Sequence, residues 1–155
     1  MARGQLCRKP RAAFTLGVVL RDEGCLVGEC CLGLLAPSGK DRPPDAATIG
    51  FMLHRDYWGR GYATEAARAM LRLAFQGLGL SRVYGGCLPE NIASRRVMEK
   101  AGMVGQGLRS GFPGSPPGRE ALVFAIDRDA WEALGGDGEA RPFESSAPEA
   151  GAGRA

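Results

Sequence analysis

The feature that most constrains this chain is a change of hydrophobic period near residue 60. Residues 47–54 read Ala-Thr-Ile-Gly-Phe-Met-Leu-His, a short apolar run typical of a strand. From there on apolar side chains recur three and four positions apart, at Ala63, Ala66, Ala67, Met70, Leu71, Ala74 and Phe75. This is the stripe of an amphipathic helix, and Gly77 supplies a stop. The sequence therefore predicts a strand that leads into a helix through a loop containing Gly59 and Gly61.

Further short elements are predicted on both sides of this pair. The chain reads as strands over 14–21, 26–35, 81–88, 103–108 and 121–126, and as a short helix from Asn91 through Ala101. Asp22-Glu23-Gly24 joins the first two strands as a hairpin turn, and the Gly/Pro-rich run 111–118 joins the last two. The order of elements predicts an α/β (α+β) fold, a largely antiparallel sheet flanked by helices.

Composition is consistent with one globular domain and two different ends. The 155 residues are 45% apolar and 24% charged, which is ordinary for a folded protein. The Gly/Ala/Glu/Pro/Ser-rich segment 135–155 has too few apolar residues to offset its ordering entropy, so we expect it to be disordered. The expected organisation is a basic segment 1–13, a domain 14–134 and this tail.

Charge and hydropathy argue against nucleic acid and membrane as partners. The net charge is +3, but four basic residues fall in the first eleven positions and residues 135–155 carry −2, so the body between them carries only +1. Phosphate-backbone binding needs clustered Lys and Arg. No apolar run approaches the roughly 20 residues of a membrane span, and the N-terminus lacks an apolar signal core. We therefore expect a cytoplasmic protein.

The cysteines do not suggest a metal or a disulfide framework. Their number is odd and no Cys-x-x-Cys spacing occurs among Cys7, Cys25, Cys30, Cys31 and Cys87. His54 is the only histidine in the chain, so a Cys/His zinc site has no second imidazole. We expect reduced, mostly buried thiols and no bound metal.

The loop before the predicted helix has the character of an anion cradle. Glycines let successive backbone N–H groups turn toward one point, and a helix N-terminus adds unpaired donors and a positive dipole end. A P-loop would need Gly-Lys-Ser/Thr here, and a dinucleotide fingerprint would need a third glycine where Thr64 stands. The competing interpretation is a plain strand-to-helix turn.

Two blocks in this region carry a family resemblance. The first is Ile49-Gly50-Phe51-Met52-Leu53-His54 followed by Tyr57-Trp58-Gly59-Arg60-Gly61-Tyr62-Ala63-Thr64-Glu65-Ala66. The second is Asn91-Ile92-Ala93-Ser94-Arg95-Arg96-Val97-Met98-Glu99-Lys100-Ala101-Gly102-Met103. Both blocks resemble the GNAT superfamily of acetyl-CoA-dependent N-acetyltransferases, within its ribosomal-protein N-terminal acetyltransferase-like branch. The resemblance continues more weakly from Leu26 to about Trp131.

The resemblance implies acetyl-CoA as co-substrate and a primary amine as acceptor. It implies that the backbone at Phe51, Met52 and Leu53 aligns the pantetheine arm and offers an N–H near the thioester oxygen. It implies that a cradle of Gly59, Arg60, Gly61, Tyr62, Ala63 and Thr64 holds the pyrophosphate. Asn91 would bind the pantetheine or cysteamine portion, and Ser94 would protonate the departing CoA thiolate. From the residues alone, Asn91 also reads as a helix N-cap and Ser94 as a helix-surface hydroxyl.

The chain departs from the family pattern in three places. Thr48 occupies a slot where many members have a glutamate base, and threonine cannot act as a base at neutral pH. Met98 occupies the slot of a tyrosine acid. The first strand and two helices of the family are not seen before Phe14, which predicts an open acceptor wall and sheet edge. Either a partner subunit, as in a homodimer, covers that gap, or the chain starts downstream of the native start.

These departures leave the base and the activity open. The proton of the amine could pass to Glu29, Asp45, His54 or bulk water. As residues without a catalytic role, Glu29 is expected to point to solvent from its strand and His54 to pack at a strand end. Tyr57 and Trp58 are expected to pack under the loop, with shaping of the acceptor mouth as the alternative. The leading hypothesis is an N-acetyltransferase acting on a protein N-terminus or a small-molecule amine. The alternative is a truncated or degenerate acyl-CoA-binding module that retains the cofactor half and turns over little.

Overall fold

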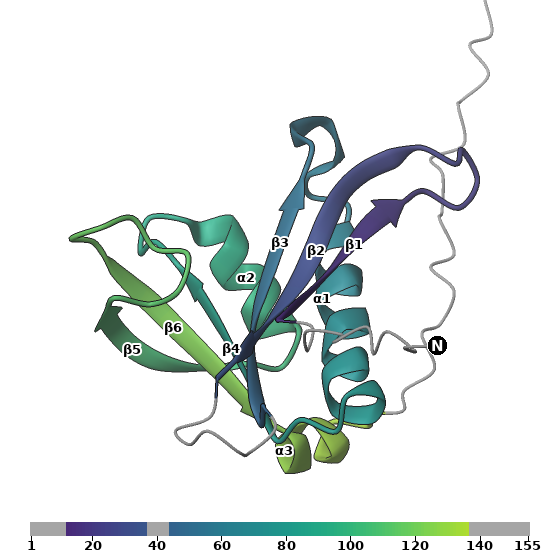
Figure 1. Ribbon diagram of the computed structural model, residues 1–155. Helices are drawn as coiled ribbons and strands as arrows, with labels where there is room; N and C mark the ends of the chain where they lie inside the picture. Colours follow the sequence, from purple (N-terminus) through teal and green to yellow (C-terminus); the bar gives the residue numbers. More distant parts are fainter. Residues whose placement is uncertain (1–11, 37–43, 137–155) are drawn as a thin grey trace, which may run out of the picture.

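The protein forms one twisted sheet of six strands in the order β1-β2-β3-β4-β6-β5 (Figure 1). This computed structural model describes residues 12–36 and 44–136; most of the predicted basic segment and tail lie outside them. The strands are β1 (Ala13–Val19), β2 (Leu26–Leu35), β3 (Ala46–Leu53), β4 (Arg82–Cys87), β5 (Val104–Ser110) and β6 (Glu120–Asp127). The helices are α1 (Tyr62–Arg72), α2 (Ile92–Lys100) and α3 (Arg128–Ala133), with a 3-10 turn η1 (Arg55–Tyr57) and a π-helical turn η2 (Leu73–Gly77). The predicted mixed, largely antiparallel fold is confirmed.

The core lies between the sheet and the helices α1 and α2. Side chains alternate across each strand, so Cys30 and Leu32 of β2 and Ile49 of β3 face the same side as the apolar stripe of α1. Leu32 and Leu71 are fully buried. Burial of a side chain of this size stabilises the fold by about 1.5–3 kcal/mol. The opposite face of β2 and β3 carries smaller and more polar residues.

Two helical details differ from the sequence prediction. The predicted helix over 63–75 starts one residue earlier, and its α-helical part ends at Arg72. The chain then continues as η2, where Leu78 N–H donates to Leu73 O at 2.9 Å. The prediction also contained no α3. That helix has only six residues, too few for a periodic signal, and the buried Trp131 holds it against Phe75 with the ring centroids 5.3 Å apart.

The site is positioned by the single parallel pair of strands in the sheet, β3 and β4. Their ladder runs from Ala46 opposite Arg82 to Ile49 opposite Gly85 and stops there. Both strands continue past that point, and Figure 1 shows them diverging. Because parallel strands end at the same edge of a sheet, the loops that follow β3 and β4 begin on the two sides of one gap.

Two glycines of β4 allow close packing where the strands separate. A Cβ at Gly85 would stand 2.5 Å from the Sδ atom of Met98, and one at Gly86 would stand 2.5 Å from the ring of Phe112. Met98 is buried in the helix-side core, whereas Phe112 covers β4 from the opposite face. A larger residue in place of either glycine would displace the side chain that lies against it.

Candidate functional site

At the end of β3, beyond the last pair with β4, backbone groups face the gap between the two strands and pair with no described strand there. His54 N–H donates to Val27 O of the neighbouring chain segment at 2.8 Å. Because N–H groups alternate in direction along a strand, the N–H of Met52 also points toward β2, whereas those of Phe51 and Leu53 point into the gap. The carbonyl of Leu53 accepts the indole N–H of Trp58 at 2.9 Å, consistent with this direction. Of the three backbone positions singled out from the sequence, two therefore face the gap.

The glycine loop lies at the mouth of this gap and leads into α1. Gly59 and Gly61 have φ values of +75° and +85°, a region that favours glycine. No atom stands within 4 Å of a Cβ built at either position, so the space above both residues is open. Gly61 is the N-cap of α1 and has no side chain to satisfy the first N–H groups. The first helical bond is Glu65 N–H to Gly61 O at 3.0 Å, so the preceding N–H groups of Ala63 and Thr64 have no acceptor within the helix.

Two arginines beside this loop rest on aromatic rings. The guanidinium of Arg60 lies 5.5 Å from the centroid of Tyr57, and that of Arg55 lies 5.9 Å from the centroid of Trp58. The ring of Trp58 is 57% exposed, so the expected packing of this residue beneath the loop is only partial. Glycine N–H groups, a helix N-terminus and nearby cations together form an arrangement suited to an anion.

The N-terminus of α2 lies beyond the end of β4. Asn91 caps this helix, because its Oδ1 accepts the N–H of Ser94 at 3.0 Å. The N-cap reading of Asn91 is thus confirmed, and its side-chain amide keeps two N–H donors on Nδ2. Ser94 is half-buried, and its capping contact uses only the backbone, which leaves the hydroxyl out of this bond.

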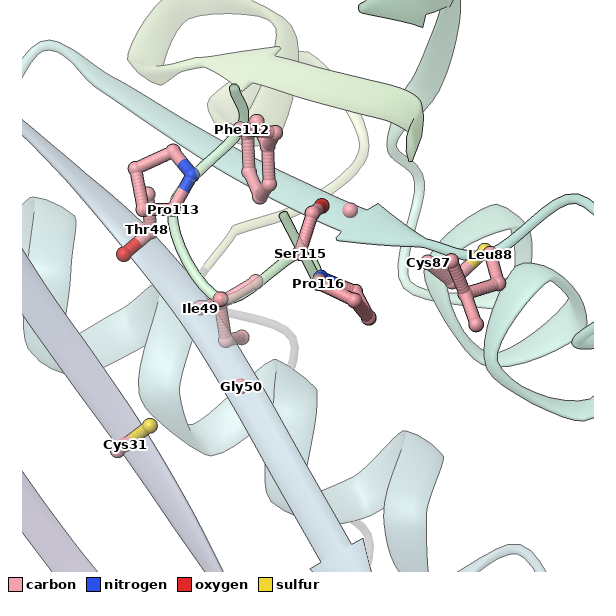
Figure 2. Close-up of a pocket in the computed structure, with 12 residues that line it drawn as sticks. Cys31, Thr48, Ile49, Gly50, Cys87, Leu88, Phe112, Pro113, Ser115 and Pro116 are labelled. Atoms are coloured by element: carbon pink, nitrogen blue, oxygen red, sulfur yellow. The ribbon is translucent and has the colours of Figure 1, made fainter. Parts of the chain in front are cut away.

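A cavity of about 370 Å³ opens in the gap on the face opposite α1. Cys31, Thr48 and Gly50 line it from β2 and β3, Gly86 and Cys87 line it from β4, and a segment from Phe112 to Pro116 closes it. Figure 2 shows Phe112, Pro113, Ser115 and Pro116 reaching over the space between β3 and β4. The gap therefore has the glycine loop at its mouth, beside α1, and this cavity on the opposite face.

The cavity wall is neutral and carries small polar groups. It contains the hydroxyls of Thr48 and Ser115 and the thiol of Cys31, whereas the side chain of Cys87 belongs to the core on the helix side. Burial raises the pKa of the Cys87 thiol, with a further increase from Glu99 opposed by Arg95. That thiol is accordingly protonated at neutral pH and a poor nucleophile. No carboxylate or basic side chain is among the residues that line this first cavity.

An ion pair ties the cavity-closing segment to the start of α2. Arg119 Nη2 lies 2.5 Å from Glu90 Oε1, and Glu90 directly precedes the capping Asn91. Backbone hydrogen bonding at Glu90 and the Arg119 guanidinium hold the pKa of this carboxyl below its usual range. Both side chains are more than half exposed, so the pair positions the loop while adding at most about 1 kcal/mol to stability.

The three candidate bases lie in different surroundings, and only one of them lies on the face of the cavity. His54 is 66% exposed and lies 3.6 Å from Asp56, so the expected packing of His54 at the strand end is wrong. Asp45 is exposed at the start of β3, where its carbonyl accepts the hydroxyl of Ser81. Glu29 is also exposed, as expected, but it stands two residues from Cys31 on the same strand face, the face of the cavity. Within β2 and β3 it is the only carboxylate.

Thr48 and Met98, the two residues that stand where many family members have a base and an acid, have structural roles. The hydroxyl of Thr48 donates to Gly33 O at 3.4 Å and lines the cavity. Met98 is 2% exposed and packs on Gly85, so this slot offers no acid. The segment from Phe112 to Pro116 is predicted from the sequence only as a loop, and its position over the cavity is not. Gly/Pro content signals a loop, but no local pattern indicates that it folds back over β4.

Comparison with known proteins identifies the family of this chain. Residues 3–104, about two thirds of the chain, match the family model described as acetyltransferase (GNAT) domain. The chain belongs to the GNAT acetyltransferase family. It is 35% identical over 115 residues to the uncharacterized N-acetyltransferase YnaD of Bacillus subtilis, covering 74% of this chain. Since that match covers 64% of the relative, this GNAT chain spans somewhat less than two thirds of the relative's length.

Solved structures agree on the GNAT fold. Aminoglycoside acetyltransferase AAC(6')-Ib in complex with coenzyme A matches with a TM-score of 0.65 at 22% identity, covering 79% of this chain and 70% of that one. Ribosomal-protein-S5-alanine acetyltransferase from Vibrio fischeri matches with a TM-score of 0.65 at 21% identity, covering 77% and 64%. The predicted GNAT resemblance, with ribosomal-protein acetyltransferases among its similar structures, is confirmed. Among the described residues no helix is long and apolar enough to cross a membrane.

Proposed function

We propose that this protein is an N-acetyltransferase that moves the acetyl group of acetyl-CoA to a primary amine. The observation that carries the proposal is the β3–β4 ladder that stops at Ile49, with the N–H groups of Phe51 and Leu53 turned into the gap. A strand edge left unpaired inside a sheet can pair with the amide groups of an extended ligand arm. Membership of the GNAT family supports the same activity.

The residues around the gap fit acetyl-CoA in three places. The open space above Gly59 and Gly61 and the N–H groups of Ala63 and Thr64, which have no acceptor within the helix, suit a pyrophosphate, and Arg60 lies in the same loop. The free edge at Phe51 and Leu53 suits the two amides of pantetheine. Asn91 uses its Oδ1 as a helix cap and offers Nδ2 to a carbonyl of the same arm. Capping and cofactor binding are therefore compatible in this one side chain.

The acceptor amine enters, in this proposal, from the cavity on the opposite face. Its nitrogen forms a bond to the acetyl carbonyl carbon, and the bond from that carbon to sulfur breaks. A strand N–H facing the gap stabilises the oxyanion, and the hydroxyl of Ser94 donates its proton to the CoA thiolate and regains one from water. The proton lost by the amine passes through water to Glu29, the carboxylate on the cavity face.

The Glu29 assignment has its own test. Glu29→Gln should lower kcat about 10- to 100-fold at neutral pH and leave the acetyl-CoA dissociation constant unchanged. The loss should shrink as pH rises, because more of the acceptor amine is then already neutral. A rate equal to that of the wild type at every pH would exclude Glu29 as the base and leave bulk water in that role.

A competing function is acyl-CoA binding with little turnover. Thr48 hydrogen-bonded to a backbone carbonyl and Met98 buried in the core favour it, because neither slot supplies acid or base. Steady-state CoA release with a panel of amines and peptides separates the two functions, with calorimetry of acetyl-CoA binding in parallel. Binding with acceptor-dependent CoA release supports the enzyme, and binding without release supports the module. Absence of binding contradicts both.

The proposal includes the oligomeric state and the cellular location of the protein. The outer edge of β1 pairs with no strand among the described residues, and Leu16 and Val19 on that strand are 48% and 55% exposed. We propose that a second copy covers this edge in a cytoplasmic homodimer, and that the isolated monomer binds acetyl-CoA but acetylates weakly. Sedimentation combined with turnover tests this; a compact, fully active monomer would contradict it.

A further inference from the structure

A second cavity, of about 470 Å³, adjoins the first on the same face of the sheet. The two share Thr48, Phe112 and Pro113, so they form neighbouring parts of one groove. The walls differ in charge. The first cavity is lined by neutral residues, whereas the second contains Arg82, Tyr84, Gln106 and Arg109.

The positive charge of the second cavity is only partly compensated. Arg82 Nε lies 3.2 Å from Asp127 Oδ1, and its guanidinium stacks 5.2 Å from the centroid of the Tyr84 ring. The ring and the carboxylate hold the guanidinium beside the cavity, although the buried Nε makes no aligned hydrogen bond. No described residue forms a hydrogen bond or ion pair with the two Nη groups, which leaves them for a ligand. Among the described residues, Arg109 donates only to the carbonyl of its neighbour Leu108, at 3.1 Å. None of the described residues that line this cavity is acidic.

The register of the sheet places this charge near the point where the proposed reaction occurs. The β3–β4 ladder ends at Gly85, three residues after Arg82. At about 3.3 Å per residue, Arg82 lies roughly 10 Å from the opening of the gap. An extended peptide covers that span in about three residues.

We propose that the second cavity is an anion-recognition subsite of the acceptor, so that the preferred substrate is an amine with a carboxylate about 10 Å away. This inference rests on the proposed acetyl transfer. The two ends of the groove then complement such an acceptor. Glu29 lines neither cavity but lies on the same face of the sheet, two residues from Cys31 at the amine end, whereas Arg82 and Arg109 line the other end for the carboxylate. Both a peptide with an early acidic residue and a small amino acid derivative have this chemistry.

Direct binding to the CoA-loaded protein tests the subsite even if turnover is weak. Two decapeptides with free N-termini, one glutamate at position 3 or position 9 and otherwise equal composition, are compared by calorimetry in saturating CoA. We expect about tenfold tighter binding of the position-3 peptide. Comparing the affinities of Gly-Gly-Glu amide and Gly-Gly-Gln amide tests the same preference for a carboxylate in a small amine. Tight binding of only the peptide assigns a peptide source, and tight binding of both assigns a groove open to small amines. A diamine of similar length should not bind measurably.

Two variants connect the preference to the arginines. Arg109→Glu should abolish or invert the preference for glutamate at position 3, and Arg82→Gln should reduce it about fivefold. Arg21→Glu, on the β1–β2 turn, makes the same charge change as the first variant away from the cavity and should keep the preference. The Arg82 variant also loses the ion pair with Asp127, which could impair folding. The Arg109 variant keeps that pair, so its result does not depend on such a folding defect. Equal affinity for the two decapeptides, or a preference that survives Arg109→Glu, overturns the subsite. Loss of acetyl-CoA binding in the wild type would instead contradict the proposed function.

Discussion

The two sides of the β3–β4 gap are built in different ways. On the helix side, one continuous segment from β3 through the glycine loop to α1 supplies backbone groups, and α2 adds its capped N-terminus. On the opposite face, the cavity is assembled from β2, β3, β4 and the β5–β6 loop. The first side depends on local backbone conformation, whereas the second depends on distant segments meeting. Substitutions on the two sides should therefore alter different properties.

The largest effect is expected at Gly61. Gly61→Asp adds a side chain at a φ of +85° and places a negative charge at the N-terminus where we propose the pyrophosphate binds. Acetyl-CoA affinity measured by calorimetry should fall by about 100-fold or more. Gly135→Asp, at a φ of +82° with equally open surroundings after α3, is the matched control for backbone strain and should keep full affinity. Unchanged affinity in the Gly61 variant would contradict the cradle.

The next largest effect is expected on the rate of the chemical step, without a change in acetyl-CoA binding. Ser94→Ala should lower kcat by up to about 100-fold and leave acetyl-CoA affinity nearly unchanged. The α2 cap survives this change because Asn91 accepts the backbone N–H of residue 94. Ser94→Thr keeps a hydroxyl and should recover much of the rate in the CoA-release assay. If the alanine variant retains full kcat, Ser94 is a surface hydroxyl and the thiolate takes its proton from water.

A change on the opposite face should affect the acceptor alone. Gly86→Ala places a Cβ 2.5 Å from the Phe112 ring, which must move and deform the cavity. The KM of the acceptor should rise about tenfold, while the acetyl-CoA dissociation constant stays the same. Gly105→Ala is the control, because its Cβ would meet Phe124 at an ordinary 3.7 Å. A parallel loss of acetyl-CoA affinity in the Gly86 variant would show that the two sides are not separate.

The smallest effect separates the two roles of Asn91. Asn91→Ala should cost about 1 kcal/mol of stability, measured by denaturant unfolding, and should also weaken acetyl-CoA binding. Asn91→Asp keeps an oxygen to cap Ser94 N–H but loses the Nδ2 donors. It should keep the stability and weaken acetyl-CoA binding about fivefold. If affinity is intact in the aspartate variant, Asn91 acts only as a cap.

Most of the helix-side region could be predicted from the sequence because its signals are local. The change of period at residue 60, the glycines at 59 and 61 and the N-cap at Asn91 each act within a few residues of backbone. The short helix α3 and the π-helical turn η2 were missed for the opposite reason. Burial of Trp131 against Phe75 favours α3, and neither residue reveals that contact in its own segment.

The sequence by itself determined the order of the six strands with α1 and α2, the hairpin at Asp22-Glu23-Gly24 and the glycines of the loop, since these follow from periodicity and steric rules. Only the tertiary structure decided that β3 and β4 pair in parallel and separate after Ile49. It also decided that Phe112 closes the cavity over Gly86 and that Arg82 and Arg109 line one groove. These residues lie on different strands and loops, and packing against common neighbours brings them together. No short-range pattern records which distant segments will share a neighbour.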